Sequence, residues 1–466
     1  MGQNGRVSNL SPQPLSPLDG RYRATVQSLA DYFSEAALNR ARIKIEVEWL
    51  IWLTDKDLLK TGRPLSDGDK QNLHKLHEQF DDSTISKLHE LEKKTRHDVK
   101  AVEYLIREKL SHIGRSDLNE LVHFALTSED VNNLSYAINI RDGFDKVWIP
   151  AARALTEELR LLSREHAEVA MLSRTHGQPA TPTTLGKELA VFVHRFDRQL
   201  SRIDSQPLLG KFSGATGTFA AHVAVDDQVD WQKQSAAFLE SLGVELNPYT
   251  TQIESHDWQS ELFQKVSHFN RIAHNLATDI WTYISLGYFK QTPPAGSTGS
   301  STMPHKINPI RFENAESNLE LANAILDSLA STLTTSRLQR DLTDSSAQRN
   351  IGVGVGHSLL AIENIRAGLK ELAVNHSAML TDLLDNWEVL AEAIQTVIRA
   401  EVARGNSKIE DPYAQLKELT RGKRIGQEEI LAFINGLEIS KEAKDRLMVL
   451  KPQDYLGIAA KLAKDI

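Results

Sequence analysis

Cysteine is absent from the 466 residues of this sequence. Its absence excludes disulfide bonds, thiolate catalysis and cysteine-ligated metals, and it fits a reducing compartment. No run approaches the ~18 apolar residues that a membrane helix requires, and the N-terminus lacks the apolar core of a secretory signal. A net charge of −8 argues against a general binder of nucleic acid or membrane surfaces. We therefore expect a cytoplasmic protein in which local basic residues hold any anionic ligand.

Two kinds of ligand site find little support in the sequence. The 16 histidines show no His-Glu-x-x-His arrangement or other dense ligand spacing, so we predict no metal site. The glycines of Gly352-Val353-Gly354-Val355-Gly356 resemble a dinucleotide-binding loop only faintly, because no predicted strand precedes them. Close packing against a helix is the better interpretation of these glycines.

Strand patterns are scarce, and helical periodicity dominates instead. Apolar residues recur in steps of three and four, and no glycine or proline interrupts the longest stretch, from Asp257 to Leu286. Other helices are predicted from Ser34, as a cap, to Asp55, from Glu129 to about Glu168 with a kink at Pro150, and over 185–203 and 312–333. Such long apolar stripes need more cover than one chain supplies. We predict an all-α fold in which other subunits complete a central bundle of long helices.

Three mostly helical regions are expected along the chain. The Gly114-Arg115-Ser116-Asp117 break ends the first region, and a change to shorter helices near Val374 marks the last. The predicted boundaries are 1–116 for an N-terminal helical domain, 117–369 for the central bundle and 370–466 for a small C-terminal domain.

One polar loop is a candidate for anion binding: Gly299-Ser300-Ser301-Thr302-Met303-Pro304-His305-Lys306-Ile307-Asn308-Pro309, here called the signature loop. Its glycine and paired serines leave backbone N–H groups free to surround an anion. Asn308 is predicted to cap the next helix and Pro309 to be its first residue, which directs the positive helix end at the loop. Lys306 adds a full charge. Composition alone is equally compatible with a mobile serine-rich connection.

Three further polar stretches each have a functional and an ordinary structural interpretation. His176, in the proline-punctuated loop 173–182, can serve as a general acid or base, or can simply bond to backbone in a turn. The hydroxyls of Thr127-Ser128-Glu129-Asp130 can hold an anion or merely cap a helix. Arg340 and Arg349 suit forked contacts to phosphate or carboxylate, or only solvate a helix face.

The signature loop resembles the motif of the fumarase/aspartase superfamily at eleven positions in register. Within that superfamily the chain is similar to the adenylosuccinate lyases of the longer bacterial form. The matching stretches are Asp19-Gly20-Arg21-Tyr22, Arg96-His97-Asp98, Thr127-Ser128-Glu129-Asp130, Arg174-Thr175-His176-Gly177-Gln178, Asn247-Pro248-Tyr249-Thr250-Thr251-Gln252-Ile253 and Arg340-Asp341-Leu342-Thr343-Asp344-Ser345.

This resemblance implies an activity and an assembly. Adenylosuccinate lyases remove fumarate from adenylosuccinate to give AMP, and from succinyl-aminoimidazole-carboxamide ribotide (SAICAR) to give AICAR in purine biosynthesis. The family further implies a homotetramer whose active sites are each assembled from three chains. It implies no cofactor and no metal.

The resemblance also assigns residues at matching positions. It makes Ser300 the base and His176 the general acid, with His97 as the second candidate for the acid. Residues expected to contact the substrate are Arg21, Tyr22, Arg96, His97, Asp98, Thr127, Ser128, Gln252, Ser301, Lys306, Asn308, Asn314, Arg340, Ser345, Ser346, Ala347, Gln348 and Arg349. Two departures occur: some close relatives have Asn in place of Arg96, and Ala295-Gly296-Ser297-Thr298 lacks the acidic residue expected before the loop.

Other superfamily activities remain open at this point. They are those of fumarase, argininosuccinate lyase and carboxymuconate cycloisomerase, the last of which also carries Pro-His-Lys in its loop. Thr250-Thr251-Gln252 and the stretch 340–349 favour a nucleotide substrate. A non-catalytic relative, like the lens crystallins of this superfamily, is the other alternative. The joint presence of Ser300, Lys306, Asn308 and His176 favours an enzyme.

Overall fold

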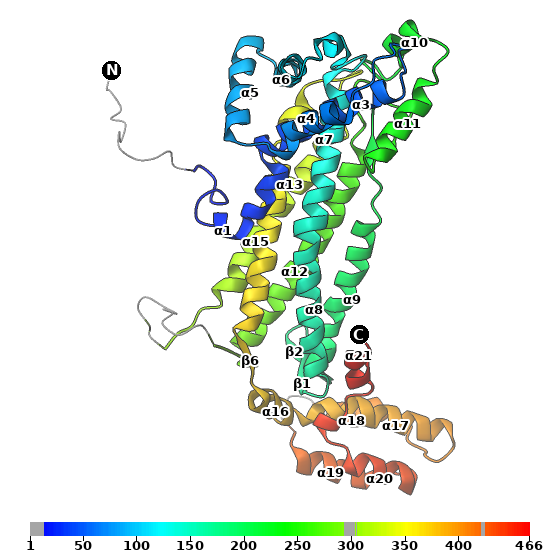
Figure 1. Ribbon diagram of the computed structural model, residues 1–466. Coiled ribbons are helices and arrows are strands. Elements are labelled where there is room, and N and C mark those ends of the chain that lie inside the picture. Colours follow the sequence, from blue (N-terminus) through cyan, green and yellow to red (C-terminus); the bar gives the residue numbers. More distant parts are fainter. Residues whose placement is uncertain (1–13, 293–302, 304, 421–424) are drawn as a thin grey trace, which may run out of the picture. The chain divides into compact units, whose positions relative to one another are not determined.

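The computed structural model describes residues 14–292, 303, 305–420 and 425–466 and is drawn in Figure 1. The chain forms two compact units. Unit 1 comprises 1–152, 199–271 and 317–363, and unit 2 comprises 153–198, 272–316 and 364–466. The division into 1–116, 117–369 and 370–466 stays a prediction.

Helices make up most of the described chain, which confirms the all-α prediction. Among the described residues, strands form three two-stranded pairs. These are β1 (Ala170–Thr175) with β2 (Gln178–Thr184), β3 (Leu209–Gly210) with β4 (Glu245–Leu246), and β5 (Phe289–Gln291) with β6 (Leu372–Val374). The first and third pairs are antiparallel and the second is parallel. Across the described ranges, no helix has both the length and the apolar character needed to cross a membrane.

Five long helices contribute residues to both units: α8 (Ile149–Glu165), α9 (Leu185–Asp204), α12 (Asp257–Ser285), α13 (Ile310–Leu333) and α15 (Ile351–Lys370). Their positions confirm the predicted helical stretches, including the uninterrupted one that begins at Asp257. Completion of a bundle by other subunits stays a prediction.

The remaining helices of unit 1 are α1 (Arg23–Val26), η1 (Gln27–Leu29), α2 (Ala30–Phe33), α3 (Glu35–Asp55), α4 (Asp67–Glu78), α5 (Asp82–Thr95), α6 (Asp98–His112), η2 (Ser116–Leu121), α7 (Ser128–Gly143), the π-helical turn η3 (Phe144–Trp148), α10 (Ala220–Val225), α11 (Trp231–Ser241) and α14 (Thr343–Gln348). Ser34 caps α3 as predicted, because its hydroxyl accepts the N–H of Ala37 at 3.1 Å. Apolar residues of α3, α4, α5 and α6 pack into one core that includes Val47, Leu73 and Ile106.

Two features predicted for unit 1, a kink near Pro150 and close packing at the glycine run, have clear physical causes. The helix predicted from Glu129 onward is interrupted by the π-helical turn η3, which ends just before Pro150, a residue without an N–H to donate. On α15, a Cβ added at Gly352 would lie 2.6 Å from Cβ of Phe33, far inside contact distance. This confirms the interpretation of the glycine run as close helix packing.

Unit 2 ends in the short helices that the sequence predicted: α16 (His376–Leu384), η4 (Trp387–Leu390), α17 (Ala391–Ala403), α18 (Pro412–Thr420), α19 (Gln427–Gly436), α20 (Lys441–Val449), η5 (Pro452–Asp454) and α21 (Ala459–Asp465). Helices α17, α19 and α20, drawn in orange to red in Figure 1, share an apolar core that includes Ile394, Ile430 and Leu447. Helix α19 ends at Gly436, and η5 begins at Pro452, as expected from residues that end and start helices.

Candidate active site

Asp98, the first residue of α6, lies between two arginines of unit 1. Its carboxylate is 2.8 Å from Arg42 and 3.5 Å from Arg349. Burial opposes ionisation, but the charge of Arg42 together with hydrogen bonds from the Val99 N–H and from Arg42 outweighs it and holds the pKa of Asp98 below its usual value. Arg349 also pairs with Glu35 at 2.8 Å. Two predicted substrate contacts that are far apart in the sequence, Asp98 and Arg349, are therefore brought together.

The same chain of contacts continues to Arg340. Arg42 donates to the side-chain oxygen of Asn132 at 2.8 Å, and the Asn132 amide donates to Glu129 at 2.8 Å. Arg340 then pairs with Glu129 at 2.9 Å. Burial raises the pKa of Glu129 against the opposing charge of Arg340. We call this continuous set the polar network, comprising Glu35, Arg42, Asp98, Glu129, Asn132, Arg340 and Arg349.

Two of the predicted site motifs lie at helix N-termini in unit 1. Arg96 follows the last residue of α5 and has a left-handed φ of 53°, which ends that helix. Helix α6 begins two residues later, at Asp98. His97 caps α6, because its Nδ1 accepts the N–H of Lys100 at 3.2 Å. A neutral His97 consequently carries its proton on Nε2. These N–H-rich ends favour anions.

Thr127 and Ser128 begin α7, the second of these helices. The Asp130 carboxylate accepts the N–H of Thr127 at 2.7 Å, which confirms the capping interpretation of this stretch. The role of Thr127 and Ser128 in holding an anion stays a prediction.

The remaining predicted contacts of unit 1 lie in three places. The N–H of Gln252 donates to the carbonyl of Gln339, next to Arg340, at 3.3 Å. Gln348 is buried and donates to Gln259 at 3.1 Å. Ser345, Ser346 and Ala347 precede it on α14. Before α1, the guanidinium of Arg21 lies 5.8 Å from the ring centre of Tyr22.

His176, in unit 2, lies at the turn of a β-hairpin, so the prediction of a loop over 173–182 was wrong. Thr175 pairs with Gln178, which leaves His176 and Gly177 as a two-residue turn with φ values of 53° and 74°. Positive φ at both positions matches the twist of the flanking strands. The His176 side chain is exposed at the hairpin tip.

A partly buried polar cluster anchors this hairpin. Arg174 on β1 pairs with Asp382 at 2.6 Å and donates to the hydroxyl of Tyr288 at 2.9 Å. Burial and the neighbouring Asp382 raise the pKa of Tyr288 to about 12, so its hydroxyl stays protonated at neutral pH. These contacts hold in place the strands that carry His176.

The signature loop is described only in part, and Ser300 and Ser301 lie outside the described residues. Lys306 is exposed, and Asn308 is half-buried. The prediction for the helix start was one residue early. Helix α13 begins at Ile310, because the Pro309 carbonyl accepts the N–H of Glu313 at 3.3 Å and so takes the cap position itself. Asn314, the fifth residue of α13, is half-buried.

Sequence reasoning missed a buried ion pair beside the polar network. Lys211 and Asp130 are 2.7 Å apart and both fully buried. Burial lowers the pKa of Lys211 in spite of the Asp130 charge. No sequence motif marks Lys211, because its pairing with Asp130 depends on how the chain folds.

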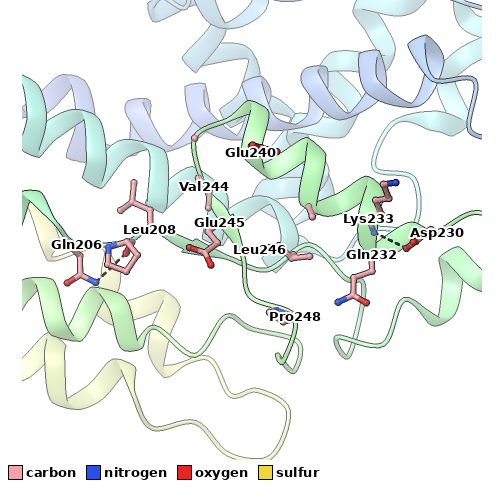
Figure 2. Close-up of a pocket in the computed structure, with 13 residues that line it drawn as sticks. Gln206, Leu208, Asp230, Gln232, Lys233, Glu240, Val244, Glu245, Leu246 and Pro248 are labelled. Carbon is pink, nitrogen blue, oxygen red and sulfur yellow. Dashed lines mark hydrogen bonds between the residues drawn. The ribbon is translucent and has the colours of Figure 1, made fainter.

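Figure 2 shows a separate cavity of about 840 Å³ in unit 1. It lies beside α11 and β4, and none of the predicted site residues lines it. The carboxylates of Asp230, Glu240 and Glu245 are among its lining groups. Their negative charge disfavours an anionic nucleotide, so this cavity is not the candidate site.

Comparison with known proteins identifies the family. Residues 20–323 match the family model described as Lyase, and residues 336–456 match the model described as Adenylosuccinate lyase C-terminal. The adenylosuccinate lyases of Haemophilus influenzae and Escherichia coli (strain K12) are each 45% identical over 453 residues, covering 97% of this chain and 98% of the relative. The chain belongs to the adenylosuccinate lyase family. The family member from Legionella pneumophila (strain Corby) is 47% identical over 451 residues, with the same coverage.

Solved structures support the fold of this adenylosuccinate lyase family member. The 3-carboxy-cis,cis-muconate lactonizing enzyme from Pseudomonas putida has a TM-score of 0.70 and 20% identity, covering 95% of this chain and 97% of that one. The fumarate lyase from Mesorhizobium sp. BNC1 has a TM-score of 0.72 and 18% identity, covering 94% and 97%. At such identities the likeness shows the shared fold alone.

Proposed function

We propose that this chain eliminates fumarate from adenylosuccinate to give AMP, and from SAICAR to give AICAR. The observation that carries the proposal is the match to adenylosuccinate lyases along nearly the whole chain. The polar network supports it, because it includes both arginines of the stretch 340–349 that is assigned to the nucleotide, Arg340 and Arg349. No cofactor enters the proposed reaction, because acid–base groups suffice for this elimination.

The chemistry sets three tasks for the protein. A base must take the weakly acidic proton next to a carboxylate of the succinyl group. The electron pair left behind makes that carboxylate doubly anionic. The pair then forms the carbon–carbon double bond of fumarate, the carbon–nitrogen bond breaks, and the leaving nitrogen takes a proton from an acid. Stabilising the doubly anionic intermediate is the largest of these tasks.

The signature loop is proposed to perform the first two tasks. Ser300 takes the proton on its Oγ, since a surrounding field of positive charge makes an alkoxide accessible. Lys306 and the loop amides face the charged carboxylate, with Ser301 as a donor, while Asn308 fixes its orientation. The exposed Lys306 and the nearby start of α13 support this role, because both place positive potential there.

His176 is proposed as the acid. Its place at the tip of an anchored hairpin suits a group that must reach a substrate bound elsewhere. An imidazole with its proton on the nitrogen that faces the leaving group delivers that proton as the bond breaks. His97 is the second candidate, and we assign it a role in shaping the charge near the acid.

The nucleotide end is proposed to bind in unit 1. Nε of Arg340 is buried and lacks a hydrogen-bond partner among the described residues, so it remains a donor for a ligand. Arg349 is 38% exposed at its side chain and held in place by two carboxylates, which suits a forked contact to phosphate. Arg21, Tyr22 and Ser345 are the other residues proposed to hold the nucleotide end. The rest of the substrate site is proposed to be lined by Arg96, Asp98, Thr127, Ser128, Gln252, Asn314, Ser346, Ala347 and Gln348.

We further propose a cytoplasmic homotetramer in which three chains complete each active site. The exposure of His176 supports this arrangement, because a general acid works best when other groups cover it and exclude water. Apolar helix stripes of this length also favour association with other copies.

An absorbance assay on the purified chain tests the activity. Adenylosuccinate and SAICAR are offered alongside argininosuccinate, malate and 3-carboxymuconate, each at the same concentration. We expect conversion of adenylosuccinate to AMP and fumarate, and of SAICAR to AICAR and fumarate, with no turnover of the other three. Turnover of any of those three without turnover of adenylosuccinate would refute the proposed function.

A further inference from the structure

Two histidines and a glutamate meet between α3 and α4, within unit 1. Glu48 lies on α3, and His74 and His77 lie one turn apart on α4. Oε1 of Glu48 is 3.2 Å from Nε2 of His74, and the two imidazole ring centres are 5.7 Å apart. One ligand atom from each of the three residues lies within 4.8 Å of the others. The sequence signal for this cluster is the His-x-x-His spacing of His74 and His77 on α4.

One ring nitrogen of this cluster lacks a partner within the part of the chain that the structure describes. Nε2 of His77 is buried and has no hydrogen-bond partner among the described residues, while Nε2 of His74 lies 3.2 Å from Oε1 of Glu48. Buried polar atoms in folded proteins are nearly always paired, so an unpaired imidazole nitrogen beside a second imidazole and a carboxylate indicates a missing ligand.

We propose that Glu48, His74 and His77 bind one divalent transition-metal ion of the zinc class. Two imidazole nitrogens and one carboxylate oxygen are a donor set that Zn²⁺ and Co²⁺ accept, with water in the remaining position. This site is separate from the polar network and plays no part in the proposed elimination.

The distances allow such a site after small side-chain movements. Tetrahedral coordination with bonds of ~2.0–2.1 Å places ligand atoms ~3.3 Å apart. Glu48 and His74 already meet that spacing at 3.2 Å, and the widest separation in the group is below 4.8 Å. Closing it takes a movement of about 1.5 Å, within reach of χ rotations of side chains that are only half-buried. Partial exposure also gives the ion a route from solvent.

The surrounding charges set the strength of binding. Lys44 and Arg40 face His77 and oppose a cation, whereas the Glu48 carboxylate attracts it. We therefore expect micromolar rather than nanomolar affinity. The bound ion would join α4 to α3, and Leu73 is the residue through which α4 is otherwise buried. A gain in thermal stability is the expected consequence.

Co²⁺ is the probe for the test, because its visible absorption bands report ligand geometry. The purified full-length chain is first dialysed against a chelator and then titrated with Co²⁺. We expect one equivalent to bind per chain with a dissociation constant of about 1–50 μM, and Zn²⁺ to abolish the bands by displacement. Zn²⁺ should also raise the thermal midpoint of the unaltered chain.

Variants decide whether the cluster is the site. His77→Ala and Glu48→Gln should each weaken Co²⁺ binding at least about tenfold and remove the thermal shift. His89→Ala, which alters an exposed histidine on α5, should bind like the unaltered chain. Glu48→Gln keeps the shape of the side chain and preserves the test if His77→Ala fails to fold. Equal Co²⁺ affinity in the unaltered chain and both cluster variants, or no binding by the unaltered chain at about 1 mM Co²⁺, would overturn the proposal.

Discussion

Replacement of Arg42 by methionine removes the charge at the centre of the polar network while nearly conserving side-chain volume. The Arg42 side chain is 3% exposed and contacts Asp98 at 2.8 Å, Asn132 at 2.8 Å and Asn39 at 3.0 Å. Breaking a buried ion pair by removing one partner costs about 3–5 kcal/mol. The Asp98 side chain is 31% exposed and keeps Arg349 nearby, so solvent and the second arginine reduce the cost. We expect the free energy of unfolding to fall by about 2–3 kcal/mol for Arg42→Met.

Urea denaturation measures this loss. With a slope of about 3 kcal/mol per M, the midpoint of Arg42→Met should lie about 0.7–1 M below that of the unaltered chain. Arg271→Met is the matched control, since Arg271 pairs with Asp327 at 2.6 Å but both side chains are about half exposed. Its loss should stay within about 1 kcal/mol. Equal midpoints for Arg42→Met and the unaltered chain would refute the reasoning.

The pH dependence of the same variant follows from the lowered pKa of Asp98. A carboxyl whose folded pKa lies below its ordinary ~3.9 contributes stability above that value, and the contribution is lost as the pH falls through the folded pKa. The difference in midpoint between Arg42→Met and the unaltered chain should therefore be full at pH 7 and shrink below about pH 4. A difference that grew in acid would contradict this sign.

Three further predictions concern the loop, the substrate and the packing of the fold. Lys306→Gln should lower kcat about 10²–10³-fold in the adenylosuccinate assay, because it removes charge facing the doubly anionic carboxylate. The control Lys290→Gln, at an exposed lysine, should leave kcat unchanged. Equal kcat values for Lys306→Gln and the unaltered chain would exclude the assigned role. Arg349→Lys should raise KM about tenfold with little change in kcat, since lysine cannot make the forked contact; a loss confined to kcat would contradict that. Gly352→Ala should cost about 1–3 kcal/mol in urea unfolding, because its Cβ would lie 2.6 Å from Phe33; an unchanged midpoint would disprove the close contact.

The helices could be predicted from sequence because their signals are local. Ser34 supplies a cap for α3, and the absence of glycine and proline after Asp257 gives α12 nearly its observed length. The hairpin β1–β2 could not be predicted from the sequence, since a two-residue hairpin turn is usually marked by Asn-Gly or Asp-Gly rather than by His176-Gly177.

The residues of the candidate site stay a prediction from sequence motifs, and the contacts that link them in the structure could not be predicted from the sequence. Asp98 and Arg349 were expected from family positions, but nothing local in the sequence pairs them. Arg42 and Asn132, which connect them to Arg340, lie in ordinary helical stretches. Their role depends on contacts between distant segments, and periodicity carries no information about such contacts.

A mixing experiment tests the central claim, that the base and the acid of one active site come from different chains. Ser300→Ala and His176→Ala should each be nearly inactive, with losses of about 10²–10⁴-fold. When the two inactive proteins are exchanged into mixed tetramers, about a quarter of the sites should combine an intact Ser300 with an intact His176 and regain activity. Verified mixed tetramers that remain as inactive as the separate variants would contradict the account.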